Sequence, residues 1–260
     1  MRAALEFQNV SVAIPSGRLL LDDVSLALEE GTVTAILGRS GSGKTTLLRT
    51  ANRMIEPSSG QIFVAGANVD ERGVVQLRRK MGYVIQETGL FPHFNVERNV
   101  GIVLEAEGQS REQRVARSEE LLQLVGLDPG AFSHRFPHQL SGGQRQRVGL
   151  ARALAAEPKI LLMDEPFGAL DPLTRAEMQD MLRELLHRLH TTVLLVTHDL
   201  DEALYLADRI VLLGEGKVVA NLARDEFLQS EQPEIVAYAR AFRRGQSSAA
   251  ADSVARDGTA

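Results

Sequence analysis

A glycine-rich segment that ends in lysine and threonine has the composition of a phosphate-binding loop. Residues 38–45 match the pattern G-x-x-x-x-G-K-[ST] without a mismatch. The glycines let backbone N–H groups surround a phosphate, and the helix that follows adds the positive end of its dipole. A chance glycine-rich turn is disfavoured, because a predicted strand precedes the segment and a predicted helix follows it. The predicted phosphate-binding residues are Gly38, Arg39, Ser40, Gly41, Ser42, Gly43, Lys44, Thr45 and Thr46.

Two adjacent carboxylates, Asp164 and Glu165, follow an apolar run at residues 160–163. Ligands of open α/β sheets bind at the carboxyl ends of strands, so these acids are placed beside a bound phosphate. We predict that Asp164 and the Thr45 hydroxyl bind Mg²⁺ and that Glu165 is the general base that activates a water. The alternative is an acidic helix cap before Pro166, which the nearby phosphate loop makes less attractive.

A second candidate anion site opens another predicted helix. Residues 140–144 read Leu-Ser-Gly-Gly-Gln, and the helix continues to Ala155. Serine is a favourable N-cap residue, and glycines leave the backbone N–H groups accessible. The alternative is an ordinary capped helix. The predicted binding residues are Ser141, Gly142, Gly143 and Gln144.

Two more polar side chains follow predicted strands. His198 ends the strand at 192–197 and could contact a γ-phosphate, although in isolation it would suggest a surface histidine that caps a helix. Gln86 ends the strand at 81–85 and could offer its amide oxygen to Mg²⁺ or water. In isolation, Gln86 would indicate nothing about function.

The elements that must position these residues follow from hydrophobic periodicity. Short apolar runs alternate with amphipathic segments, which indicates a parallel sheet covered by helices. Besides the strands named above, we predict strands at 5–13, 19–28, 33–37, 61–65, 210–213 and 217–220, and helices at 44–53, 174–189 and 200–207.

The predicted fold class is α/β, with a parallel sheet core, an N-terminal antiparallel β region and an inserted α-helical subdomain. The helical insertion covers about residues 88–156. We predict one domain over residues 1–244 and a disordered tail over residues 245–260, which are small and polar.

The composition excludes several classes of protein. Of the 260 residues, 44% are hydrophobic and 24% are charged, as in globular proteins. The 34 acidic and 29 basic residues give a net charge of −5, which disfavours broad binding to nucleic acid. The absence of cysteine excludes disulfides and thiol catalysis. No apolar stretch approaches the roughly 20 residues of a membrane span, so we expect any membrane role to come through a partner.

The order of these motifs resembles the nucleotide-binding subunit of ATP-binding-cassette transporters, a P-loop NTPase with a RecA-like core. The resemblance covers roughly residues 5–225 and includes a further segment, Gly-Ala-Leu-Asp at 168–171. It implies that ATP and Mg²⁺ bind at the phosphate loop, and that residues 141–144 face the ATP of a second copy in a head-to-tail dimer. Asp171 corresponds to the family's dimer-contact loop.

The resemblance also implies the binding partners of the protein and its location in the cell. Residues 86–99 would contact integral-membrane permease subunits, and the chain would lie at the cytoplasmic face of the cell membrane. Segments at 53–60, 82–86, 89–93 and 163–172 resemble the importers of osmoprotectants such as glycine betaine and choline. A substrate-binding protein would then be an indirect partner, and no nucleic acid is expected.

The sequence departs from the family pattern at three places. Ile14 stands where the family has an aromatic residue that stacks on adenine, and Arg39 stands where it often has proline. Many osmoprotectant ATPases also have CBS domains, which are not expected here after Ala223.

Other functions remain open from the sequence alone. These are a cassette ATPase for another substrate such as an amino acid or lipid, a soluble cassette that acts on nucleic acid or ribosomes, and a P-loop kinase. A kinase would leave residues 140–144 unexplained, and the acidic charge disfavours a DNA-binding role.

Overall fold

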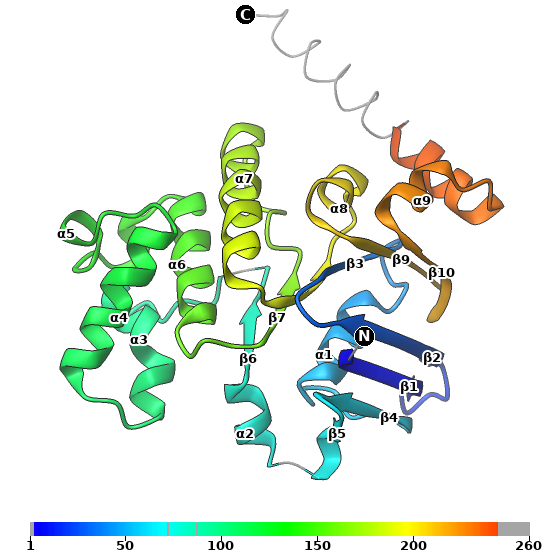
Figure 1. Ribbon diagram of the computed structural model, residues 1–260, viewed down its shortest axis with the longest axis horizontal. Coiled ribbons are helices and arrows are strands. Elements are labelled where there is room, and N and C mark those ends of the chain that lie inside the picture. The colour runs from blue at the N-terminus through cyan, green and yellow to red at the C-terminus, as the bar shows by residue number, and fades with distance from the viewer. Residues whose placement is uncertain (1–2, 72, 87, 244–260) are drawn as a thin grey trace, which may run out of the picture.

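The described residues of the computed structural model, 3–71, 73–86 and 88–243, form two sheets and a group of helices (Figure 1). An antiparallel sheet has the order β2-β1-β4-β5, and a second sheet has the order β10-β9-β3-β8-β7-β6. The pairs β3–β8, β3–β9, β6–β7 and β7–β8 are parallel, whereas β9 and β10 form an antiparallel hairpin. The strands are β1 (Ala3–Ala13), β2 (Leu19–Glu29), β3 (Val33–Leu37), β4 (Ser59–Val64), β5 (Ala67–Asn68), β6 (Met81–Val84), β7 (Ile160–Asp164), β8 (Thr192–Val196), β9 (Arg209–Gly214) and β10 (Lys217–Ala223).

Helices cover the second sheet and form a separate group beside it (Figure 1). They are α1 (Lys44–Ala51), α2 (Val74–Arg79), α3 (Val96–Ala106), α4 (Arg111–Leu124), α5 (Pro129–Phe132), α6 (Gly142–Leu154), α7 (Pro172–Leu189), α8 (Leu200–Leu206) and α9 (Arg224–Gln229), with 3-10 turns η1 (Val69–Glu71) and η2 (Pro137–Gln139). Residues 233–243 are also helical. In the described part of the chain, no helix combines the length and apolar character that a membrane span requires.

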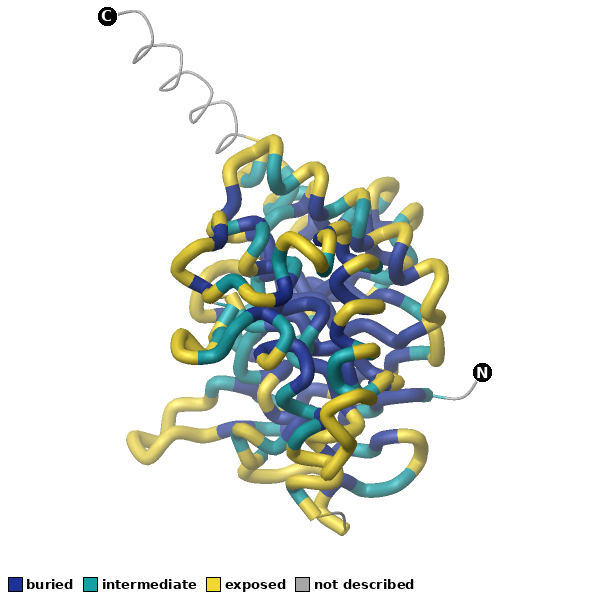
Figure 2. Tube along the Cα trace, turned by 90° about the vertical axis from the view of Figure 1, so that its left-hand side faces the viewer, coloured by how far each residue is buried: buried dark blue, intermediate teal, exposed yellow. Residues whose placement is uncertain are grey.

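The central strands are buried on both faces, and alternate residues belong to different layers. In β7, Leu161 and Met163 pack with the helices, whereas Ile160 and Leu162 pack toward the antiparallel sheet and α1. This follows from the two-residue period of a strand, which sends neighbouring side chains to opposite faces. Figure 2 shows the buried residues in the interior of the trace and the exposed residues at its outer loops.

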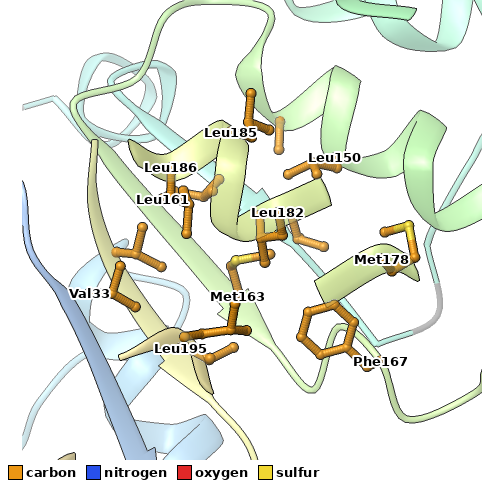
Figure 3. Close-up of a cluster of buried hydrophobic side chains, with 14 of the residues drawn as sticks. Val33, Leu150, Leu161, Met163, Phe167, Met178, Leu182, Leu185, Leu186 and Leu195 are labelled. Atoms are coloured by element: carbon orange, nitrogen blue, oxygen red, sulfur yellow. The ribbon is translucent and has the colours of Figure 1, made fainter. Parts of the chain in front are cut away.

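Helix α7 covers one face of the parallel sheet. Its buried residues Met178, Leu182, Leu185 and Leu186 recur at helical spacing and form one apolar stripe. Figure 3 shows this stripe beside strand residues that include Leu161. This packing fixes the N-terminal end of α7, where the 168–171 segment joins the helix.

The helices α3 to α6 lie between β6 and β7 in the chain, although these two strands are neighbours in the sheet. Ser110 is the N-cap of α4 and forms a capping box with Gln113, which stabilises the start of that helix. The predicted α/β fold class is confirmed, including the antiparallel region and the helical insertion. The predicted disordered tail at 245–260 lies outside the described residues.

Several elements were not predicted from the sequence, and the predicted end of one helix differs from the structure for a physical reason. The strand β5 and the helices α2 and α9 were not predicted because they have only 2, 6 and 6 residues. The helical segment 233–243 was also missed, although its apolar residues recur at helical spacing. Helix α1 ends at Ala51 rather than at Arg53, which has a φ of 53° and cannot continue a right-handed helix.

Candidate functional site

The loop after β3 needs glycine at two positions because other backbone segments approach it closely. A Cβ atom on Gly38 would lie 2.3 Å from the Leu213 carbonyl oxygen, and one on Gly43 would lie 2.6 Å from the Leu20 carbonyl oxygen. Gly43 also has a φ of 102°, in the left-handed region. The loop is therefore pressed against its neighbours in a shape that larger residues cannot take.

Lys44 lies inside this loop. Its Nζ donates hydrogen bonds to the carbonyl oxygens of Gly38, at 2.9 Å, and Arg39, at 3.0 Å. Burial lowers the pKa of Lys44, against the opposing effect of the Glu165 and Asp164 carboxylates. The N-cap of α1 is Gly43, which has no side chain to cap the first N–H groups of the helix. A buried ammonium and uncapped N–H groups together favour an anion at this point.

Asp164 lies at the carboxyl end of β7 and meets the first turn of α1. The Thr45 Oγ1 donates to Asp164 Oδ1 at 2.9 Å, and Arg49 Nη2 lies 3.9 Å from Asp164 Oδ2. Burial raises the pKa of Asp164, and the hydrogen bond from Thr45 and the charge of Arg49 counter part of that effect. Mg²⁺ is commonly bound by one or two carboxylates together with phosphate oxygens. The Thr45 hydroxyl and the Asp164 carboxylate fit that requirement.

Glu165 occupies a strained backbone conformation beside two other predicted site residues. Its φ is 45°, and its N–H donates to the Val196 carbonyl at 2.9 Å. For residues other than glycine this conformation costs about 1–2 kcal/mol, and such strain is frequent at functional sites. Its Oε2 lies 3.4 Å from Gln86 Nε2 and 3.4 Å from His198 Nδ1. Three strands, β6, β7 and β8, therefore bring these side chains to one sheet edge.

A cavity of about 450 Å³ lies over the loop. It is lined by Arg18, Leu20, Ser40, Gly41, Gly43, Lys44, Thr45, Thr46, Glu165 and His198. Sequence reasoning missed Arg18 and Leu20. Ile14 is not among these lining residues and instead lies in the turn after β1, where its N–H donates to the Arg18 carbonyl at 3.0 Å. The turn thus presents Arg18, rather than Ile14, to the cavity.

The Ser141–Gln144 segment lies away from this cavity, at the start of α6. Ser141 and Gln144 form a capping box, with N···O distances of 3.0 and 3.3 Å between backbone and side chain. A Cβ atom on Gly143 would lie 2.4 Å from Thr174 Cγ2, so α6 and α7 approach closely there. Asp171 caps α7 by accepting from the Thr174 N–H at 3.1 Å. Within one chain, the structure therefore brings this segment to Asp171 and not to the phosphate loop.

Two polar residues of α6 that the sequence analysis missed fix the segment after β6. Gln146 Nε2 donates to the Gln86 carbonyl at 3.1 Å, and Arg152 donates to the carbonyls of Thr88 and Gly89. Gln146 is only 3% exposed. A buried polar residue on the apolar face of a predicted helix is the signal that could have identified it.

Comparison with known proteins gives the family. The ABC transporter family model matches residues 21–168. The choline transport ATP-binding protein OpuBA of Bacillus subtilis is 47% identical over 232 residues, which cover 89% of this chain and 61% of that protein. The glycine betaine uptake system ATP-binding protein YehX of Escherichia coli is 47% identical over 215 residues, which cover 83% of this chain and 69% of that protein. The chain spans about three-fifths of the length of several curated relatives that it matches.

Solved structures agree with the family model. The ATP-binding cassette MJ0796, in a dimeric post-hydrolysis state bound to ADP and Pi, has a TM-score of 0.76 and 33% identity over 85% of this chain and 98% of that one. The cbiO1 subunit of a Clostridium perfringens transporter complex has a TM-score of 0.81 and 29% identity over 89% of this chain and 93% of that one. The chain belongs to the ABC transporter family.

Proposed function

We propose that the chain binds Mg-ATP in the cavity over the phosphate loop and hydrolyses it. The observation that carries this proposal is the position of the Glu165 carboxylate, which lines the same cavity as Lys44 and lies 3.4 Å from both Gln86 and His198. A carboxylate beside a phosphate site can accept a proton from an attacking water.

Each side chain has a role in this reaction that follows from its position. Lys44 exchanges its two carbonyl partners for the β- and γ-phosphate oxygens, whose charge offsets the burial of the ammonium. Thr45 and Asp164 would bind Mg²⁺, which neutralises charge on the phosphates when bound. Glu165 accepts the proton of the water, and Gln86 and His198 orient the water and contact the γ-phosphate, respectively.

The active form that we propose is a head-to-tail dimer. Ser141, Gly142, Gly143 and Gln144 form a capped helix start remote from the phosphate loop of their own chain, so they can complete a nucleotide site only on a second copy. Asp171 lies beside them, in position to contact that copy. The dimeric cassette bound to ADP and Pi, similar in fold and sequence, supports a dimeric form.

We further propose that hydrolysis drives the import of osmoprotectants of the quaternary-amine class. The names of the relatives, which include choline and glycine betaine transport proteins, support this substrate class. The chain would then bind permease subunits at the cytoplasmic face of the membrane, with a substrate-binding protein as indirect partner.

Two measurements test these proposals separately. Phosphate release from ATP by the purified chain should require Mg²⁺ and stop with EDTA, and a protein that releases no phosphate would refute hydrolysis. Osmotically stressed cells that lack the chain should lose uptake of labelled glycine betaine and choline, and the wild-type gene should restore it. Normal uptake without the chain, with hydrolysis intact, would refute the substrate class alone.

A further inference from the structure

A C-terminal helical segment, residues 233–243, packs against the catalytic layer, outside the region that the family model matches. Ile235, Tyr238, Ala239 and Phe242 recur at i, i+3, i+4 and i+7 and pack against the core cluster of the parallel sheet. Ile235 is only 3% exposed. This apolar stripe fixes the segment against the sheet and determines where its polar groups lie.

The hydroxyl of Tyr238 reaches the nucleotide site. It donates a hydrogen bond to the His198 carbonyl oxygen at 3.1 Å. Burial raises the pKa of Tyr238 to about 12, against the smaller opposing effect of the nearby Gly38 backbone. The phenol therefore remains protonated at neutral pH and keeps its role as a donor.

The carbonyl that this hydroxyl contacts belongs to the loop after β8, which lies beside the phosphate loop. Gly38 directly follows β3, and His198 lies just beyond the end of β8. These strands are parallel neighbours, so their carboxyl ends lie side by side. The Tyr238 hydroxyl therefore holds the loop that carries His198 where it runs beside the start of the phosphate loop.

We propose that Tyr238 is a positioning residue for ATP hydrolysis, a role that rests on the hydrolysis proposed above. Its hydroxyl fixes the main-chain carbonyl of His198 beside the phosphate loop. The imidazole of His198 is 63% exposed and lies 3.4 Å from Glu165, so its own surroundings constrain it weakly. The residues on either side are fixed, because the Thr197 N–H donates to the Ile36 carbonyl and the Asp199 N–H donates to Thr197 Oγ1 at 3.0 Å. The hydrogen bond from the Tyr238 hydroxyl holds the carbonyl of His198 itself.

The substitution Tyr238→Phe removes the hydroxyl and keeps the packed ring. We expect kcat to fall about three- to tenfold, the kinetic equivalent of one ordinary hydrogen bond. The Kd for ATP, measured by calorimetry, should change less than about twofold, because Lys44 and Thr45 are untouched. The matched control is Tyr205→Phe on α8, whose hydroxyl contacts Asp180 away from the site and whose loss should leave kcat unchanged.

A double-mutant cycle separates positioning from a general structural effect. If Tyr238 acts through His198, then Tyr238→Phe should have little further effect on single-turnover hydrolysis in a His198→Ala background. The positioning role is wrong if Tyr238→Phe slows hydrolysis equally in the wild-type and His198→Ala backgrounds, or if Tyr238→Phe alone leaves kcat unchanged. In either case, hydrolysis by the wild-type protein would still support the proposed function. A wild-type chain that hydrolyses no ATP would overturn both.

Discussion

The hydroxyl of Thr45 is expected to stabilise the protein in a way that depends on the charge of Asp164. In the structure this hydroxyl donates to Asp164 Oδ1 at 2.9 Å, and the Asp164 side chain is 9% exposed. Thr45→Val keeps the shape of the side chain and removes the donor. Arg49, whose side chain is 46% exposed and lies 3.9 Å away, offers only a screened replacement.

The size of the expected loss in stability follows from the type of hydrogen bond that Thr45→Val removes. A hydrogen bond to a charged group contributes about 1.5–3 kcal/mol, against about 0.5–1.5 kcal/mol for a neutral pair. Burial raises the pKa of Asp164 and the Thr45 bond lowers it, so the bond stabilises the ionised form. Its contribution is therefore complete above the pKa of Asp164 and decreases as the pH falls through that value. We expect a loss of about 1.5–3 kcal/mol at pH 7.5 and about 0.5–1.5 kcal/mol once Asp164 is protonated.

Urea unfolding of the nucleotide-free protein across this pH range measures the effect. The matched control is Thr50→Val in the same helix, because the Thr50 hydroxyl donates to the neutral Leu47 carbonyl at 2.7 Å. That variant should lose about 0.5–1.5 kcal/mol at every pH. If Thr45→Val costs no more than Thr50→Val at pH 7.5, or if its cost does not depend on pH, the role given to the Thr45–Asp164 pair is wrong.

Three further substitutions have distinct expected outcomes. Lys44→Ala should raise the Kd for Mg-ATP about 10- to 150-fold in calorimetry, because a charge-assisted donor to phosphate is lost; an unchanged Kd would contradict the phosphate site. Ser141→Arg should leave ATP binding intact and lower hydrolysis at least about 100-fold, because an unpaired charge would be buried in the dimer; wild-type hydrolysis would refute the head-to-tail model. Asp164→Asn should raise the free energy of unfolding of the nucleotide-free protein by about 0.5–2 kcal/mol, because it removes a buried charge. The same substitution should abolish stabilisation by Mg²⁺. Thermal melts that show no increase in stability would contradict a destabilising effect of the buried Asp164 charge.

The parts of the molecule that the sequence predicts well are those with strong local signals. The strand β7 is a short apolar run with no alternative pattern, and its end places Asp164 and Glu165 where ligands of parallel sheets bind. The phosphate loop combines glycines, Lys44 and Thr45 in a spacing that specifies both its shape and its chemistry. Periodicity and spacing are sufficient for such elements.

The parts that could not be predicted depend on tertiary contacts. Tyr238 lies far along the chain from His198, and no local pattern links a C-terminal aromatic residue to the loop after β8. Arg18 reaches the cavity because the turn after β1 directs it there, while Ile14 bonds within the turn. The strain at Glu165 also depends on its backbone bond to Val196, which arises only when β7 and β8 pair.

Hydrolysis by Glu165→Gln tests most directly whether this carboxylate is the general base. The substitution keeps the size of the side chain and removes its capacity to accept a proton, and the phosphate loop and Asp164 remain unchanged. We predict that the rate of phosphate release falls about 10²–10⁴-fold, that calorimetry shows Mg-ATP binding comparable to wild type, and that size-exclusion chromatography with Mg-ATP shows a stable dimer. A Glu165→Gln protein that hydrolyses ATP at the wild-type rate would contradict the catalytic role of Glu165 and with it the site assigned here.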